Sequence, residues 1–365
     1  MSHPRNSFPL SCYQTRVDDL TKKFNLMNPA ERREYFRAKV GREIEALKAH
    51  FKDNTFIAYW LGKKNSGKGT YSKLMMEIFG ADKISHVSVG DLVRRLSADL
   101  VNSKQKEELL AYLAQHYRGY VSVNKALEAF LKRDTKSLLP SEFVLTLVKR
   151  EIDRLPKKII FIDGFPRNLD QISYSLYFRN LIDYRDDPDI FIAIDIPEQV
   201  ISDRMKYRVV CPLCQTPRNL KLLATPAVGY DEAKKEFYLK CDNPSCHSER
   251  MLAKEGDNLG IEAIRERLEM DESLIKKVFS LHGVPKILLR NSIPVKEAGS
   301  LIDDYEITPA YAYELKDGQA QVKETPYIVK DDEGVDSYSL LAPPVVVSLI
   351  KQLYKILVER ERESC

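Results

Sequence analysis

The chain has 365 residues, of which 44% are hydrophobic and 30% are charged, and its formal net charge is +4 at pH 7. This length provides a substantial buried core, and the charge excess is too small to indicate a nucleic-acid-binding protein. The 15 Gly, 18 Pro and 6 Cys exclude collagen-like, low-complexity and disulfide-scaffold classes. The sequence contains no apolar run as long as a membrane span and no secretory signal, which predicts a cytoplasmic protein without a membrane partner.

Residues 1–54 read as a polar, helical N-terminal extension. Asn28 is a predicted helix cap, with Pro29 at the first helical position and Glu31 three residues after the cap. No chemistry is readable in this segment.

From Thr55 the pattern changes to a short apolar run that ends at Gly62, as a buried strand would. Similar runs lie at 84–89, 158–163, 189–195 and 285–290. Helical patterns lie between the runs, at 67–79, 91–102, 141–155, 169–181 and 197–207. Strands that alternate with helices predict an α/β fold with a five-stranded parallel sheet covered on both faces.

Two stretches interrupt this alternation, and a different pattern follows it. Residues 103–137 form an extra helical insert, which we expect to hold two helices, and residues 211–246 are bounded by cysteines. Alternation around Asp317-Gly318 predicts a hairpin, and an amphipathic helix is expected from about 344 to 359. We therefore expect an N-terminal extension (1–54), a core (55–304) and a C-terminal hairpin and helix extension (305–365).

A phosphate-binding loop is predicted between the first strand and the first helix of the core. Glycines allow successive backbone N–H groups to point at phosphate oxygens, and the helix N-terminus adds its positive dipole end. A chance glycine turn is the alternative, but the loop spacing, the strand and the helix all agree. The residues expected at the phosphates are Gly62, Asn65, Ser66, Gly67, Lys68, Gly69 and Thr70. Because Gly69 stands where a Ser or Thr usually binds Mg²⁺, the metal must be held largely by phosphates and water, with Asp163 nearby.

A second phosphate-facing motif follows the strand at 158–163. Asp163 would lie at the carboxyl end of a parallel strand, where it can orient Mg²⁺-bound water. Arg167 would present its guanidinium group to a second phosphate. Capping of a turn by Asp163 and surface pairing of Arg167 are the structural alternatives.

The segments 67–70 (GKGT) and 163–171 (DGFPRxxxQ) resemble the two signatures of the adenylate kinase family of nucleoside monophosphate kinases. The segments 88–94 (SVGDLVR), 138–142 (LLPSE), 203–208 and 264–268 also resemble parts of this family. The resemblance therefore covers about residues 55–304. It implies a P-loop NTPase fold with a helical nucleoside-monophosphate-binding (NMP-binding) insert at about 88–142 and a zinc-bound lid at about 208–257.

The resemblance also implies roles for single residues. Lys68 should lie on the transferring phosphate, and Arg204 should pack near the base of ATP. Arg208 and Arg267 should clamp the donor and transferring phosphates. The residues implied at AMP are Val89, Gly90, Arg94, Leu139, Gly164, Arg167 and Gln171. One lysine, several arginines and Mg²⁺ are sufficient for phosphoryl transfer, which needs positioning and charge neutralisation rather than covalent catalysis.

The chain departs from the family pattern at three places. Lys63 and Lys64 add two cations to the phosphate loop, which predicts either tighter nucleotide binding or contact with another partner. Val89 replaces a threonine near the acceptor base, so that the base selectivity is open. In the lid, residues 254–258 (KEGDN) stand where the family usually has Arg-x-Asp-Asp, so that this one arginine is not carried over, while Asp257 is expected to help close the lid.

Four cysteines, Cys211, Cys214, Cys241 and Cys246, lie within one short segment. A Cys-Pro-x-Cys turn places two thiolates on one side of a tight loop, and four sulfurs predict a structural Zn²⁺ site rather than free thiols or a disulfide. The second pair is more widely spaced than usual, so that His247 is an alternative to Cys246 as the fourth ligand. A zinc-held lid at this place agrees with the family resemblance.

The sequence therefore predicts a monomeric kinase that catalyses ATP + AMP ⇌ 2 ADP with Mg²⁺. A kinase for CMP, UMP or GMP is the first alternative, because of Val89 and the long insert. A nucleotide-binding regulatory protein on the same fold is the second. A zinc-ribbon nucleic-acid binder is disfavoured, because basic and aromatic residues do not cluster around the cysteines.

Overall fold

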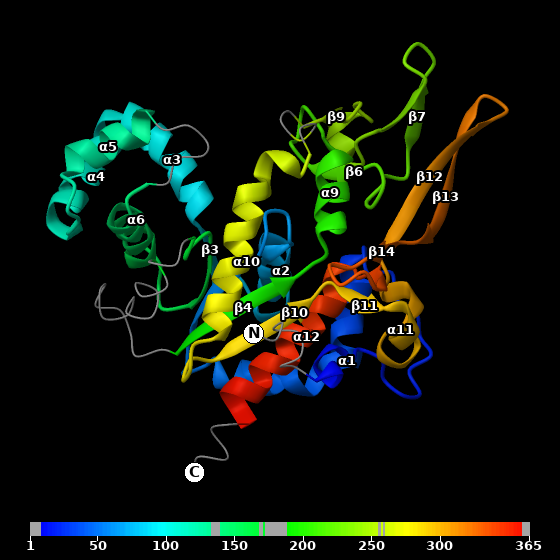
Figure 1. Ribbon diagram of the computed structural model, residues 1–365, viewed down its shortest axis with the longest axis horizontal. Helices are drawn as coiled ribbons and strands as arrows, with labels where there is room; N and C mark the ends of the chain where they lie inside the picture. The colour runs from blue at the N-terminus through cyan, green and yellow to red at the C-terminus, as the bar shows by residue number, and fades with distance from the viewer. Residues whose placement is uncertain are drawn as a thin grey trace.

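The computed structural model describes residues 9–132, 139–167, 171, 188–254, 257 and 260–359. A five-stranded parallel sheet with the strand order β10-β4-β1-β3-β2 lies at its centre (Figure 1). The strands are β1 (Ile57–Leu61), β2 (Ile84–Ser88), β3 (Ile159–Asp163), β4 (Asp189–Asp195) and β10 (Lys286–Arg290). Each strand matches a predicted apolar run, which confirms the α/β fold with a parallel sheet. Apart from Gln171, the helix predicted at 169–181 lies outside the described residues.

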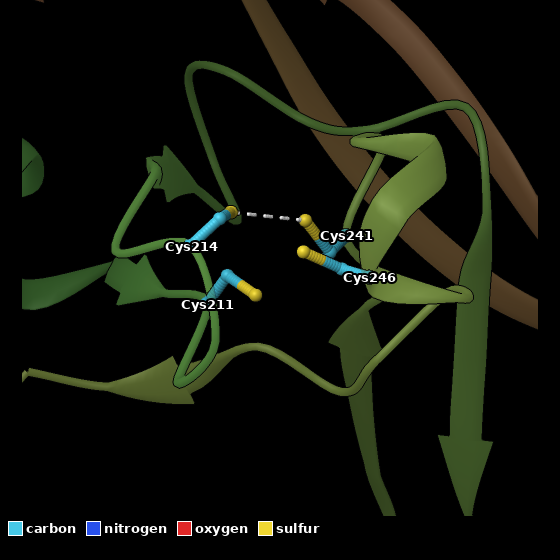
Figure 2. Close-up of side chains that lie close together, drawn as sticks. All are labelled: Cys211, Cys214, Cys241 and Cys246. Carbon is cyan, nitrogen blue, oxygen red and sulfur yellow. Dashed lines mark hydrogen bonds between the residues drawn. The ribbon is translucent and has the colours of Figure 1, made fainter.

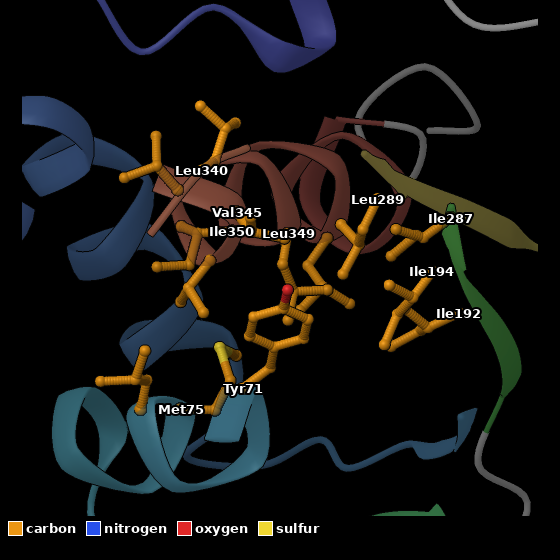
Figure 3. Packing of buried hydrophobic residues seen from close by; sticks show 14 of the residues in the cluster. Tyr71, Met75, Ile192, Ile194, Ile287, Leu289, Leu340, Val345, Leu349 and Ile350 are labelled. Carbon is orange, nitrogen blue, oxygen red and sulfur yellow. The ribbon is translucent and has the colours of Figure 1, made fainter. Parts of the chain in front are cut away.

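Helices cover both faces of this sheet. Every residue of β1 is buried, because alternate side chains enter two separate hydrophobic clusters: Ala58 and Trp60 enter one, and Tyr59 enters the other. The first face carries α1 (Pro29–His50), α2 (Lys68–Phe79) and α12 (Ala342–Tyr354). The second face carries α3 (Val89–Val101), α6 (Ser141–Asp153) and α10 (Arg265–Phe279). Figure 3 shows the first face, where α2 and α12 pack against β4 and β10.

A helical lobe stands at one side of the sheet (Figure 1). It contains α3, α4 (Ser103–His116), α5 (Val123–Lys132) and α6. The two middle helices fall within the predicted insert at 103–137, whose last residues lie outside the described part of the chain.

A small β-rich lobe follows α9 (Glu198–Lys206). Its strands are β5 (Arg208–Val210), β6 (Pro217–Asn219), β7 (Val228–Asp231), β8 (Glu236–Leu239) and β9 (Leu252–Ala253). The lobe has a hydrophobic core of its own, in which three of the four cysteines are buried together with Val209 and Leu239. This lobe corresponds to the predicted lid.

Both terminal extensions pack into the main core. Helix α12 packs against α1, α2 and β10, while β15 (Asp336–Ser339) pairs with both β14 (Ile328–Lys330) and β11 (Ser292–Pro294), which precedes α11 (Val295–Leu301). The buried Glu306 carboxylate accepts hydrogen bonds of 2.5 Å from both Thr15 and Tyr35. These contacts join the N-terminal extension to the C-terminal one across almost the whole length of the sequence.

The predicted hairpin is formed by β12 (Pro309–Lys316) and β13 (Gln319–Pro326), which meet at the expected Asp317-Gly318 turn. It lies beside the lid (Figure 1). The Tyr313 ring stacks on Phe237 at 5.6 Å between centroids, and its hydroxyl donates a 2.5 Å hydrogen bond to the carbonyl of Leu220. The C-terminal extension therefore contacts the lid as well as covering the sheet. No helix within the described residues is long and apolar enough to cross a membrane.

Candidate active site

The loop between β1 and α2 has the backbone geometry of a phosphate cradle. Gly67 has φ +112°, and a Cβ atom built on it would lie 2.8 Å from the Tyr71 ring. Glycine is therefore required there, because a larger residue is strained by the backbone angle and collides with the ring. Directly after this turn, α2 begins at Lys68, so that free N–H groups of its first turn face the loop.

Lys68 points back over this loop. Its Nζ atom donates to the carbonyl oxygens of Gly62 at 2.7 Å and Lys63 at 3.1 Å, and it lies 3.7 Å from Oδ1 of Asp163. The side chain is only 12% exposed. Burial lowers the pKa of this amine, and the nearby Asp163 carboxylate opposes that shift. The phosphate loop and the second motif thus meet at a buried lysine.

The second motif forms a tight turn after β3. Gly164 has φ +85°, and Nε of Arg167 donates to its carbonyl at 2.9 Å. The backbone N–H of Arg167 donates to Oε1 of Gln171 at 2.7 Å, and the Gln171 amide donates to the Ser141 hydroxyl at 3.0 Å. Gln171 therefore ties this turn to the start of α6, in the predicted NMP-binding region.

A single cavity of about 900 Å³ joins the two motifs. The predicted residues that line it are Asn65, Ser66, Gly67, Lys68, Gly69, Thr70, Gly90, Arg94, Asp163, Gly164, Arg167, Arg204, Arg208 and Arg267. Four other predicted residues lie outside its lining: Gly62, Val89, Leu139 and Gln171. Val89 is only 4% exposed, and its side chain belongs to the hydrophobic core of the second sheet face.

Two arginines of the lid side already reach the phosphate loop. Nη1 of Arg204 donates to the carbonyl of Asn65 at 2.9 Å, and Nη1 of Arg208 donates to the side-chain oxygen of Asn65 at 3.3 Å. Asp257 accepts two further hydrogen bonds from Arg208, at 2.5 and 2.9 Å. Asp257 thus holds the lid arginine over the loop, while Arg267 lines the cavity from the start of α10.

The two additional lysines of the loop have different surroundings. Lys63 is 7% exposed, and its Nζ atom lies 3.2 Å from Asp332 and 3.6 Å from Glu198. Asp332 also accepts a 2.8 Å hydrogen bond from the backbone of Glu198. Lys63 therefore contacts the C-terminal extension instead of the cavity, whereas Lys64 lines the cavity.

Sequence reasoning missed several residues of this cavity. His86 of β2 lines it, and its buried Nε2 atom has no hydrogen-bond partner among the described residues. Burial lowers the pKa of His86 against the influence of Asp163, which favours the neutral ring. Both terminal extensions also contribute cavity residues: Leu26, Met27, Arg32, Thr308, Ser339, Leu340, Leu341, Ala342 and Pro343. The motifs carry no signal for these residues, because only long-range packing brings them here.

The four predicted metal-ligand cysteines converge in the lid (Figure 2). Their sulfur atoms all lie within 4.8 Å of one another, and the sulfurs of Cys214 and Cys241 are 3.6 Å apart. Tetrahedral coordination at a Zn–S distance of about 2.3 Å requires sulfurs roughly 3.8 Å apart, so that the group fits one ion. Hydrogen bonds with Thr216 lower the pKa of the Cys214 thiol to about 6, which favours the thiolate that a metal needs. Cys246, and not His247, completes the group.

The chain is similar in sequence to known kinases over half of its length or more. No protein-family model matches the chain. The chain is 31% identical over 192 residues to the adenylate kinase of Mesomycoplasma hyopneumoniae strain 7448, and the match covers 52% of this chain and 71% of that relative. The chain belongs to the adenylate kinase family. This confirms the predicted family and makes the protein an enzyme of the nucleoside monophosphate kinase class.

Two further relatives are named after different substrates. A probable UMP-CMP kinase 2 of Arabidopsis thaliana is 29% identical over 190 residues, which cover 50% of this chain and 62% of the relative. The adenylate kinase of Clostridium beijerinckii is 26% identical over 229 residues, which cover 62% of this chain and 87% of the relative. The family uses Mg²⁺ with ATP. The relatives are thus named after different acceptor monophosphates. The names do not decide which base this chain prefers, which the replacement of a threonine by Val89 had left open.

Proposed function

We propose that the protein catalyses the reversible, Mg²⁺-dependent reaction ATP + AMP ⇌ 2 ADP. The observation that supports this most is the single cavity in which the phosphate loop and the Asp163–Arg167 turn face each other across Lys68. Two phosphate-binding motifs on one cavity suit a reaction between two nucleotides, and not only the binding of one.

The chain's own residues neutralise and orient the reacting phosphates. A phosphate oxygen of AMP attacks the γ-phosphorus of ATP, and the bond from that phosphorus to the bridging oxygen of the β-phosphate breaks, so that both products are ADP. Lys68 would follow the transferring group, and Arg167, Arg208 and Arg267 would balance its charge. Bound Mg²⁺ would neutralise further charge, and Asp163, which lines the cavity, would orient water on the metal. Closure of the lid over both nucleotides would exclude water and prevent hydrolysis of ATP.

The acceptor is tested by a coupled assay with ATP and AMP, GMP, CMP or UMP. We expect the highest kcat/KM with AMP, because the family resemblance implies that Gln171 hydrogen-bonds an adenine edge; its amide, which lies outside the cavity lining, must leave Ser141 to do so. The buried Val89 side chain offers no hydroxyl to the base, so that the discrimination must come from other groups. Equal or faster turnover with CMP or UMP would contradict the adenylate assignment and favour the alternative kinase.

The second alternative, a regulatory nucleotide-binding protein, is disfavoured because the chain belongs to a family of kinases. It predicts nucleotide binding without phosphate transfer. The same coupled assay decides against it if the purified protein forms ADP at a rate that depends on both substrates.

We further propose that the four lid cysteines hold one structural Zn²⁺ ion. Four sulfur ligands leave no open position, so that the ion would stabilise the lid and take no part in the chemistry.

Protein purified without added metal should therefore contain about one zinc per chain. Cys211 is fully buried, and the Cys211→Ser variant should lose the ion and unfold the lid at a lower temperature. Elemental analysis and limited proteolysis measure both effects. The matched control is Cys12→Ser, which removes a cysteine outside the lid and should keep the zinc. Wild-type protein free of bound metal, or zinc retained by Cys211→Ser, would rule the site out.

A further inference from the structure

We propose that the two terminal extensions build the pocket for the base of the nucleoside triphosphate. This inference rests on the proposed function, because it takes one arm of the cavity as the donor arm. It assigns a specificity-determining role to residues outside the 55–304 segment, in which the family motifs lie.

The order of strands in the sheet divides the residues that line the cavity into two groups, one on each side of β1. The part of the cavity beside each group is called an arm here. The phosphate loop follows the middle strand, β1. The Asp163–Arg167 turn and the 88–94 turn follow β3 and β2, on one side of β1. Arg204 comes from α9 after β4, and the strand pair of β11 and β15 follows β10, both on the other side. In Figure 1, α3 and α9 accordingly lie on opposite sides of α2.

This separation decides where the donor base can go. The triphosphate must lie across Lys68, and the acceptor occupies the arm of Arg94 and Arg167. The donor base is then left with the arm that runs along α2 past Thr70 and Leu74.

The start of α12 forms one wall of this arm. Leu340, Leu341, Ala342 and Pro343 line the cavity. The backbone N–H of Leu340 donates to the carbonyl of Asn291 at 2.8 Å, and that of Leu341 donates to the carbonyl of Glu306 at 2.9 Å. These bonds fix the wall to the end of β10 and to the buried Glu306 network, so that it is in place before a ligand binds.

The N-terminal extension supplies the rim of the same arm. Leu26 and Met27 line the cavity, and Nη1 of Arg32 donates to the carbonyl of Leu26 at 3.0 Å. Arg32 also binds both carboxylate oxygens of Glu77 in α2, at 2.7 and 3.2 Å. A two-pronged ion pair thus holds the rim against the helix that carries the phosphate loop.

The chemistry of the arm suits a planar base. Leu222 and Leu223 of the lid lobe add apolar surface to that of Leu340 and Pro343, and Arg204 offers a guanidinium plane for stacking. The Thr308 hydroxyl forms no hydrogen bond with the described residues, and its side chain lines the cavity. Apolar surfaces with a few polar groups are typical of base and cofactor pockets.

The test is to fill the arm and to measure binding without turnover. Ala342 is half-buried at the first position of α12, where it both lines the cavity and packs against the edge of the core, so that Ala342→Phe adds bulk at the cavity wall and an unchanged thermal unfolding midpoint must accompany the binding result. We expect its dissociation constant for the non-hydrolysable ATP analogue adenosine 5′-(β,γ-imido)triphosphate, with Mg²⁺, to rise at least tenfold in calorimetry. Binding of inorganic tripolyphosphate should stay within twofold of wild type, because it lacks a base.

Two further variants complete the design. Leu341→Ala removes apolar wall surface without adding bulk and should weaken the analogue about threefold or more, in line with the transfer free energy of a partly buried leucine side chain. Ala312→Phe makes the same substitution as the first variant on the exposed face of the hairpin, outside the cavity lining, and should bind like wild type.

The outcomes separate this inference from the proposed function. Unchanged analogue binding in both wall variants would overturn the inference, as would an equal loss of tripolyphosphate, which would place the wall at the phosphates. Absence of AMP-dependent ADP formation by wild-type protein would contradict the proposed function alone, because the binding measurement does not depend on turnover.

Discussion

The Lys68→Met variant is expected to lose turnover by a factor on the order of 100 or more, the scale of a lost preorganised charge contact. Lys68 is the cation that both phosphate motifs share: its amine contacts two loop carbonyls and lies 3.7 Å from Asp163. Methionine keeps the length of the side chain but removes the charge. Because charge on the transferring group changes most in the transition state, kcat should fall far more than KM rises.

Steady-state kinetics with ATP and AMP measure this loss, and Lys83→Met serves as the matched control. Lys83 is an exposed lysine outside the cavity lining, so that the same change there should leave kcat within twofold of wild type. A loss of less than tenfold in Lys68→Met, with an unchanged thermal unfolding midpoint, would mean that the transferring phosphate lies elsewhere.

The Arg94→Ala variant is expected to raise KM for AMP at least tenfold and to leave KM for ATP nearly unchanged. Arg94 lines the cavity from α3, on the side proposed for the acceptor, and among the described residues it pairs with the exposed carboxylate of Asp91 one turn earlier. Its side chain is 71% exposed, so that it can turn to a phosphate at small cost. Because it should hold the acceptor in both the ground and the transition state, its loss acts on KM more than on kcat.

The neighbouring Arg95 provides a matched control for this experiment. It carries the same charge on the same helix, but it pairs with Glu151 and lies outside the lining of the active-site cavity. Arg95→Ala should therefore leave both KM values within twofold of wild type. Equal weakening of ATP and AMP by Arg94→Ala would contradict the assignment of the 88–142 region to the acceptor.

The core of the fold followed from local patterns in the sequence. An apolar run such as 158–163 is buried on both faces only in a sheet covered by helices, and the described structure confirms that arrangement. The hairpin was predictable because Asp317 and Gly318 tolerate the positive φ angles that its turn requires, +51° and +74°. The four cysteines were recognisable as a group because their spacing matches that of known metal-ligand sets, and their sulfur atoms do lie together in the structure.

The surroundings of the two additional loop lysines could not be predicted from the sequence. Lys63 and Lys64 are adjacent and chemically identical, yet Lys63 turns to Asp332 and Glu198 while Lys64 lines the cavity. No local pattern distinguishes them, because Asp332, one partner of Lys63, lies in a loop about 270 residues further along the chain. The position of such a loop depends on tertiary packing and not on a periodic sequence pattern.

By itself, the sequence determined the alternation of strands and helices, the phosphate loop with Lys68, the turn with Asp163 and Arg167, and the cysteine group. Each of these depends on short-range geometry, in which a few consecutive residues suffice to define the backbone or the ligand spacing. Only the tertiary structure decided that the two extensions join at Glu306, that Asp332 neutralises Lys63, and that Leu26 and Ala342 reach the active-site cavity. These contacts join residues far apart in the chain, and they form only when burial of α1 and α12 on one face of the sheet brings the two ends together.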